Sequence, residues 1–189
     1  MALRIPQRRI PGVSDAYTPA NLPLQLFGTV EESFVDGPGI RYVLFTQGCP
    51  HNCPGCHNPG SHSADGGTPS STAEQWKKIT AHPHLDGITF SGGEPFLWAE
   101  ELAEIGKAAR SRGLTVMTYT GYTYEHLLER AKSDPAVHAL LACTNYLVDG
   151  PFILAERDLS LRYRGSRNQR ILDITCYPNS ADAAQADFA

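Results

Sequence analysis

The feature that most constrains the fold of this chain is an alternation of short β-rich runs with helical periods. Residues 41–47, 87–91, 114–120 and 146–149 are predicted strands, because they are short and rich in β-branched, aromatic or other apolar residues. Helical patterns separate them at residues 71–81, 98–112, 124–131 and 136–142. Strands that alternate with helices form parallel βα units, so we expect a single α/β domain of mostly parallel strands, in an open sheet or a partial barrel.

The most distinctive residues stand at the ends of these predicted strands. A loop rich in cysteine follows the first strand, Gly92-Gly93-Glu94 ends the second, Gly121-Tyr122 follows the third and Asp149-Gly150 ends the fourth. The carboxyl ends of parallel strands meet at one edge of a sheet, where the active loops of such folds lie. We therefore expect these four segments to converge on one mouth.

The cysteine loop indicates chemistry rather than a structural metal. Cys49, Cys53 and Cys56 have the spacing C-x3-C-x2-C. Three thiolates are one short of a tetrahedral zinc site and one short of a four-iron cluster held entirely by protein. A cluster held by three thiolates leaves one iron open to an exogenous ligand, which favours catalysis. The alternative is a zinc knuckle that uses His51 or His57 as its fourth ligand.

The second motif is the turn at Gly92, Gly93 and Glu94. Two glycines remove side chains, so the backbone can approach a ligand closely. Glu94 then presents a carboxylate suited to an ammonium group. The alternative is an ordinary glycine turn with a solvated glutamate.

Bulk properties exclude several classes of function. The chain has 189 residues, enough for one domain with a real core, and a net charge of -4, which argues against a nucleic-acid binder. No apolar run is long enough to span a membrane, and no apolar segment follows the arginines near the N-terminus, so we expect a cytoplasmic protein. We divide it into an extended arm (1–24), one domain (25–177) and a flexible tail (178–189).

Together these motifs resemble the radical S-adenosylmethionine (SAM) superfamily. Within it they most resemble the activating enzymes of the anaerobic (class III) ribonucleoside-triphosphate reductase, over roughly residues 26–176. The stretches that carry the resemblance are DGPGIR at 36–41, CHNP at 56–59, SGGEP at 91–95, TGY at 120–122, LVDGPF at 147–152 and RGSRNQR at 164–170.

The resemblance implies an incomplete (β/α) barrel and a mechanism. Cys49, Cys53 and Cys56 are expected to hold a [4Fe–4S] cluster whose open iron chelates the amino and carboxylate groups of SAM. A flavodoxin-like donor is expected to reduce the cluster. SAM then splits into methionine and a 5′-deoxyadenosyl radical, which takes a hydrogen atom from a glycine of the reductase large subunit.

Further residues are candidates for binding SAM or the partner. For SAM they are Ser91, Gly92, Gly93, Glu94, His57, Thr118, Thr120 and Asp149; for the partner they are Tyr122, Arg164, Arg167 and Arg170. Asp149 suits ribose hydroxyls or a cation, or else it caps a turn. Tyr122 suits the nucleoside, or else it packs on a loop. The arginines suit a carboxylate or an acidic partner, or else they form a solvated face.

One position departs from the superfamily pattern. Many radical SAM loops carry an aromatic residue just before the third cysteine, which packs on adenine, and Gly55 stands there in this chain. Backbone, His57 or another group must then hold the adenine.

Two other functions compete with the activase. A radical SAM enzyme with another substrate, such as a 7-carboxy-7-deazaguanine synthase-like enzyme or another glycyl-radical activase, would keep the chemistry. A non-catalytic metal-binding adaptor would bind metal without SAM.

Overall fold

A computed structural model describes residues 17–186 and 188 of the chain. Within them one mixed sheet has the strand order β3-β1-β2-β4-β5-β6-β7-β8, with β3 and β8 at its two open edges. The strands are β1 (Pro23–Ser33), β2 (Arg41–Thr46), β3 (Thr68–Ser71), β4 (Gly87–Gly92), β5 (Thr115–Tyr119), β6 (Tyr146–Asp149), β7 (Arg170–Asp173) and β8 (Ala184–Gln185).

The centre of the sheet is parallel, as the alternating pattern predicts. Strands β2, β4, β5 and β6 pair in parallel in that order. The flanking strands β1 and β3 on one side, and β7 and β8 on the other, pair antiparallel. The predicted α/β fold with parallel central strands is thus confirmed, and antiparallel strands extend the sheet at both edges.

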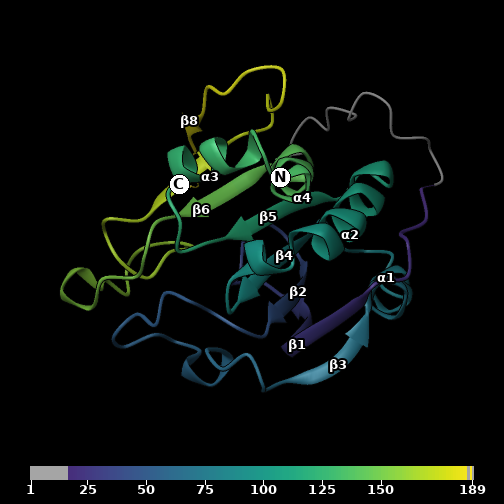
Figure 1. Cartoon of the computed structure of the whole chain (residues 1–189), viewed down its shortest axis with the longest axis horizontal. Helices are drawn as coiled ribbons and strands as arrows, with labels where there is room; N and C mark the ends of the chain where they lie inside the picture. Colours follow the sequence, from purple (N-terminus) through teal and green to yellow (C-terminus); the bar gives the residue numbers. More distant parts are fainter. Residues whose placement is uncertain (1–16, 187, 189) are drawn as a thin grey trace.

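Four helices lie in a row along one face of this sheet (Figure 1). They are α1 (Thr72–Thr80), α2 (Ala99–Ser111), α3 (Tyr124–Ala131) and α4 (Pro135–Cys143), and each matches a predicted helix. Three short 3-10 turns lie at Pro59–Ser61, Pro95–Leu97 and Leu154–Glu156. Among the described residues, no helix is long and apolar enough to cross a membrane.

Strand alternation divides the buried side chains between the two faces of the sheet. Leu44, Phe90, Thr118 and Leu147 lie opposite one another across the parallel strands. The three apolar side chains of this row join the core beneath the helices. A smaller cluster of Met117, Tyr146, Val148 and Ile171 lies on the opposite face. The large core fixes the strands, so that their carboxyl ends are held together at one edge.

A buried arginine holds the beginnings of these strands. Arg41, the first residue of β2, is fully buried and donates to Thr89 Oγ1 at 2.6 Å, to Thr115 Oγ1 at 3.0 Å and to the carbonyl of Ile88. Burial lowers the pKa of Arg41 to about 10, because the charged form loses its hydration. These hydrogen bonds tie β2, β4 and β5 together.

The division into an arm, a domain and a tail stays a prediction. Described residues of the expected arm and of the expected tail both contact the domain. Residues 1–16 of the expected arm lie outside the described residues, while Tyr17 donates to Glu104 of α2 at 2.5 Å. Burial and this carboxylate raise the pKa of Tyr17 to about 12. β1 starts at Pro23, within the expected arm, and β8 pairs with β7 from within the expected tail.

Candidate active site

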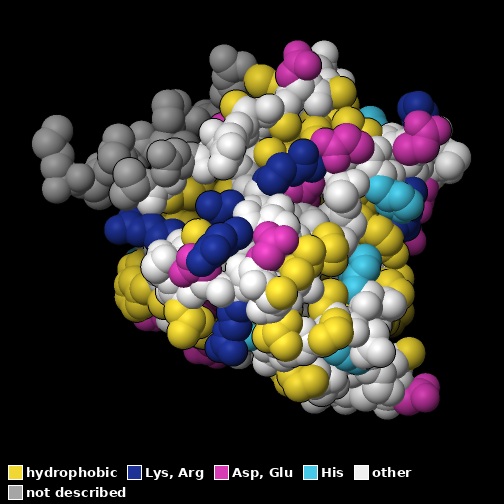
Figure 2. All heavy atoms as spheres, turned by 90° about the vertical axis from the view of Figure 1, so that its left-hand side faces the viewer, with side chains coloured by type: hydrophobic (Ala, Val, Ile, Leu, Met, Phe, Trp, Pro, Cys, Tyr) yellow, Lys and Arg dark blue, Asp and Glu magenta, His cyan; other side chains and the backbone are white. Residues whose placement is uncertain are grey.

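The carboxyl ends of the parallel strands open on a cavity of about 540 Å³. Small-molecule sites have volumes of roughly 300–1,000 Å³, so this cavity is large enough for a nucleoside-sized ligand. The loops that line it follow the parallel strands, and long loops gather on the left of Figure 1. Figure 2 views that side, where hydrophobic side chains cover much of the surface and histidines and charged side chains lie among them. The predicted convergence is therefore present for the cysteine loop and for the ends of β4, β5 and β6.

All three cysteines of the motif line this cavity. Cys49, Cys53 and Cys56 are free thiols of intermediate exposure. Burial raises the pKa of the Cys49 thiol above its ordinary value, so metal must displace a proton there. The backbone N–H of Asn58 lies 3.4 Å from Sγ of Cys56, the kind of hydrogen bond to sulfur that tunes iron–sulfur centres.

The spacing of the ligand atoms favours a cluster over a single ion. In the described part of the chain, one group of His, Cys, Asp or Glu side chains has three ligand atoms within 4.8 Å of one another. That group lies outside the cysteine loop, so the three cysteine sulfur atoms do not meet this spacing. A zinc knuckle needs its ligands that close together. His51, one expected fourth ligand, has its Nε2 2.7 Å from the Glu94 carboxylate instead. Three separated thiols on an open cavity fit a bulky cluster with one free position.

Backbone contacts hold the cysteine loop against its surroundings. Gly48 N donates to Ser61 O at 2.8 Å, and Cys49 N donates to His62 O at 3.1 Å. The indole N–H of Trp98 donates to Gln47 O at 2.7 Å. The loop is therefore fixed at its start, with Gly48 at a positive φ of 90° that other residues rarely adopt.

The two glycines at the end of β4 lie against backbone on one side and the cavity on the other. A Cβ on Gly92 would come within 2.6 Å of the Cα of Phe45, and one on Gly93 would overlap Gly48 O. Both glycines also line the cavity, as does Ser91. Their lack of side chains lets the strand end pack closely on the start of the cysteine loop and leaves backbone facing the cavity.

Glu94 is completely buried, and its carboxylate is fully engaged by protein groups. It accepts from the backbone N–H groups of Phe96 and Gly121, both at 2.9 Å, and from Thr120 Oγ1 at 2.9 Å. With His51 it has four partners. The expected solvated or ligand-facing carboxylate is therefore absent from this arrangement, and Glu94 ties the cysteine loop to the ends of β4 and β5.

Two of the residues expected at the cavity face the helices instead. Thr118 is buried, with its Oγ1 2.8 Å from Oγ1 of Thr144. Asp149 is 1% exposed and accepts from Tyr124 N at 2.8 Å. Strand alternation turns both side chains away from the cavity, and Tyr119 lines it instead. The assignment of Thr118 and Asp149 to SAM stays a prediction that this geometry does not favour.

The expected partner-facing residues do not form one group. Arg170 donates to the carboxylate of Asp149. It also donates to the two carboxylate oxygens of Glu125, at 3.0 and 2.9 Å. Both carboxylates raise the pKa of Arg170. Arg167 pairs with Asp158 at 3.1 Å and is 70% exposed. Of the three arginines, Arg164 lines the cavity.

Tyr122 packs on the cysteine loop and on α3, and the first of these contacts is the alternative use expected for it. Its ring stacks on His126 with centroids 5.1 Å apart and meets the edge of His51 at 4.5 Å. The guanidinium of Arg130 lies 5.1 Å from the same ring. Tyr122 therefore supports His51 from outside the cavity.

Gly55 leaves room that another side chain fills. A Cβ on Gly55, which has a φ of +74°, would lie 2.8 Å from Leu154. Phe152 lines the cavity beside His57, with ring centroids 5.6 Å apart. The segment after β6 and the residue after the third cysteine thus both contribute an aromatic ring to this cavity.

Three aromatic residues that no sequence motif indicated also line the cavity: Phe45, Tyr119 and Phe152. Phe45 lies opposite Ser91 in the parallel ladder, so both side chains point to the same face. Alternation from Ser91 could have identified Phe45 and Tyr119. Phe152 stands two residues beyond Gly150, and no sequence period predicts its direction.

Comparison with known proteins shows that the chain is similar to one defined group of proteins. The family described as "4Fe-4S single cluster domain" matches residues 35–172. The anaerobic ribonucleoside-triphosphate reductase-activating protein of Vibrio cholerae is 36% identical over 150 residues, covering 75% of this chain and 92% of that protein. The protein of the same name from Escherichia coli K12 is 34% identical over 144 residues, covering 71% and 89%.

More distant likenesses extend to other proteins. The pyruvate formate-lyase-activating enzyme of Clostridium pasteurianum is 41% identical over 109 residues, covering 54% of this chain and 46% of that enzyme. The crystal structure of QueE from Escherichia coli aligns with a TM-score of 0.42 and 14% identity over 53% of each chain.

Proposed function

This chain belongs to the family of the anaerobic ribonucleoside-triphosphate reductase-activating proteins, and from that premise we propose that it is a radical SAM activating enzyme. It generates a glycyl radical on the large subunit of the anaerobic reductase. The observation that carries the proposal is that three cysteines and a glycine-rich strand end face one cavity of about 540 Å³.

Cys49, Cys53 and Cys56 hold the [4Fe–4S] cluster in this proposal. When bound there, the cluster supplies the electron for reductive cleavage of SAM and so the radical that removes a hydrogen atom from glycine. The support is the donor set itself: three free thiols line the cavity, and their sulfur atoms do not all lie within 4.8 Å of one another.

The ends of β4 and β5 position SAM. We assign the amino group of its methionine part to the backbone of Ser91, Gly92 and Gly93, because these residues line the cavity. Glu94 acts as a positioning residue, since its buried carboxylate holds the cysteine loop against that backbone. Arg164 lines the same cavity and offers a cation for the carboxylate of SAM.

The adenine lies against Phe152 and His57 in this proposal. Both rings line the cavity, and their centroids are 5.6 Å apart. Flat aromatic rings stack on any nucleobase, so they can replace the aromatic residue that the loop lacks at Gly55.

An exposed apolar rim supports a macromolecular substrate. Val35 and Leu159 line the cavity and are 77% and 81% exposed. Exposed apolar side chains at the edge of a site favour protein contact. We propose that the reductase and a flavodoxin-like electron donor bind at this mouth, and that the protein works in the cytoplasm, where thiols stay reduced.

The test is an anaerobic assay of the reconstituted protein. Iron and sulfide are added, the cluster is reduced with dithionite, and SAM is supplied with and without the reductase large subunit. We expect 5′-deoxyadenosine in the products and a glycyl radical signal from the reductase by EPR. The variant Cys53→Ala, which keeps the cavity but loses a thiolate, is the matched control and is expected to form neither.

Each alternative has its own outcome. Deoxyadenosine without a glycyl radical on the reductase would keep the radical SAM chemistry and refute the substrate. Repeating the assay with pyruvate formate-lyase then tests the second activase group. A protein that binds zinc at the cysteines and forms no deoxyadenosine would be an adaptor, and the proposal would be wrong.

A further inference from the structure

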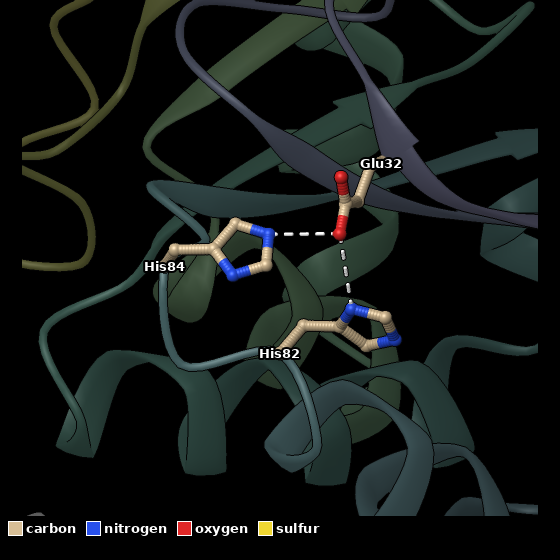
Figure 3. A group of neighbouring side chains, drawn as sticks. All are labelled: Glu32, His82 and His84. Carbon is tan, nitrogen blue, oxygen red and sulfur yellow. Dashed lines mark hydrogen bonds and ion pairs between the residues drawn. The ribbon is translucent and has the colours of Figure 1, made fainter.

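A second group of potential metal ligands lies away from the cysteine loop. Glu32, His82 and His84 converge so that both imidazoles point at one carboxylate oxygen (Figure 3). Nε2 of His84 lies 2.8 Å from Oε1 of Glu32, and Nδ1 of His82 lies 3.3 Å from the same oxygen. All three ligand atoms lie within 4.8 Å of one another.

The fold separates this group from the cavity. Glu32 is near the end of β1, and the next residue, Ser33, pairs with Arg41 at the start of β2. The cysteine loop follows the other end of β2. A strand of six residues spans roughly 17 Å, so the two groups lie at opposite ends of β2.

We propose that Glu32, His82 and His84 form a binding site for Zn²⁺ or a transition-metal ion with the same ligand preference. Ligand atoms bound tetrahedrally about 2.0–2.1 Å from zinc lie about 3.3 Å apart, close to the spacings of 2.8 and 3.3 Å found here. Imidazole nitrogen favours zinc, copper, iron or nickel over magnesium and calcium. Two imidazoles and a carboxylate leave the fourth position for water.

A neighbouring carboxylate orients one of the ligands. Oε2 of Glu31 lies 3.4 Å from Nε2 of His82, the nitrogen that faces away from Glu32. Metal-binding histidines commonly donate from their second nitrogen to a carboxylate, which fixes the tautomer and the ring. Glu31 thus favours the form of His82 whose Nδ1 lone pair is free for an ion.

Solvent reaches the site, and the ligands come from two separate segments. The side chains of His82, His84 and Glu32 are 20%, 48% and 46% exposed. His82 and His84 stand in the turn between α1 and β4, two residues apart. This turn leads to Asp86, whose carboxylate accepts from Ile40 N at 2.8 Å. A bound ion would therefore join the end of β1 to the turn that holds the start of β2.

The test measures metal binding on tag-free, cluster-loaded protein. Zn²⁺ is titrated by calorimetry after EDTA treatment and gel filtration, and zinc and iron are counted by elemental analysis. We expect one zinc per chain in addition to the cluster iron. His84→Ala should weaken binding roughly a hundredfold, and Glu31→Gln roughly tenfold, as for loss of a partner that orients a ligand.

Cobalt distinguishes this site from the cysteines. Co²⁺ held by imidazole and carboxylate lacks the strong thiolate charge-transfer absorption that a cysteine site gives. The matched control is His126→Ala, which removes another exposed histidine and should bind zinc like the wild type. The proposal would be overturned if Co²⁺ gave the thiolate absorption and zinc bound only as iron was lost. Equal zinc affinity in the wild type and in His84→Ala would also overturn it.

Discussion

Nε2 of His51, inside the cysteine loop, lies 2.7 Å from the carboxylate of Glu94 at the end of β4. Glu94 is fully buried, while the side chain of His51 is 16% exposed. The pair joins two motifs that stand more than forty residues apart in the sequence, C-x3-C-x2-C and GGE, into one unit. The position of the cysteine thiols therefore depends on a glutamate that does not itself line the cavity.

Replacement of Glu94 by Ala tests this positioning role. The change leaves buried donors of Phe96, Gly121 and Thr120 without a partner. We expect a loss of roughly 3 kcal/mol in the free energy of unfolding, or a Tm lower by roughly 6–12 °C. Scanning calorimetry of the apoprotein measures this, and the iron content after reconstitution should fall as well. An unchanged Tm and iron content with weaker SAM binding would instead place Glu94 in direct contact with SAM.

Replacement of Gly121 by Ala tests the other side of the same unit. A Cβ at this position would overlap the imidazole of His51, so the ring must move. We expect a lower Tm and less iron per chain, with partial recovery in the double variant Gly121→Ala/His51→Ala, because the clash is then removed. Gly28→Ala is the control, since its Cβ would meet nothing within 4 Å. No recovery in the double variant would contradict the steric explanation.

Which side chains reach the cavity could be predicted from the sequence only in part. The cysteines and glycines were identified because their type and spacing already define chemistry. Thr118 was expected at the cavity and Tyr119 was not considered, because β5 is buried on both sides and its alternation gives no polar face. The helices cover one face of the sheet and leave the other face to the cavity, and no residue within β5 indicates which face the helices cover.

The parallel centre of the fold was predictable and its edges were not. Regular periods within β2, β4 and the helices identify those elements locally. β7 lies in an arginine-rich segment, and β8 has two residues. Such short strands exist because their backbone groups pair with a neighbouring strand, as Leu172 does with Gln185. A long-range pairing of this kind leaves little trace in local composition.

Replacement of Phe152 by Ala tests the proposed adenine contact. Stacking of a base on an aromatic ring contributes roughly 1–3 kcal/mol, so we expect SAM affinity to fall about tenfold. Equilibrium binding of SAM to the cluster-loaded protein measures this, and the Tm of the apoprotein should change little because Phe152 is partly exposed. Phe34→Ala, which removes a phenyl ring that is 66% exposed, is the control. Equal SAM affinity in all three proteins would remove Phe152 from the site.

Replacement of Arg170 by Met tests the ion pairs beneath the mouth. Arg170 is the charged partner of Asp149, which is 1% exposed, and it also binds Glu125 at the surface. Met leaves the Asp149 charge buried without its cation. We expect a loss of roughly 2–3 kcal/mol, below the range for fully buried pairs because the Arg170 side chain is 41% exposed and water can reach it.

Control variants show whether the loss of stability comes from the unpaired buried charge of Asp149 or from removing any arginine. Urea unfolding of the apoprotein gives the free energy directly. Arg167→Met removes an arginine that is 70% exposed, so its unfolding midpoint should match that of the wild type. The double variant Arg170→Met/Asp149→Asn should recover part of the loss, because no buried charge is left unpaired. If Arg170→Met and Arg167→Met unfold at the same urea concentration, the pair with Asp149 contributes nothing and this explanation is refuted.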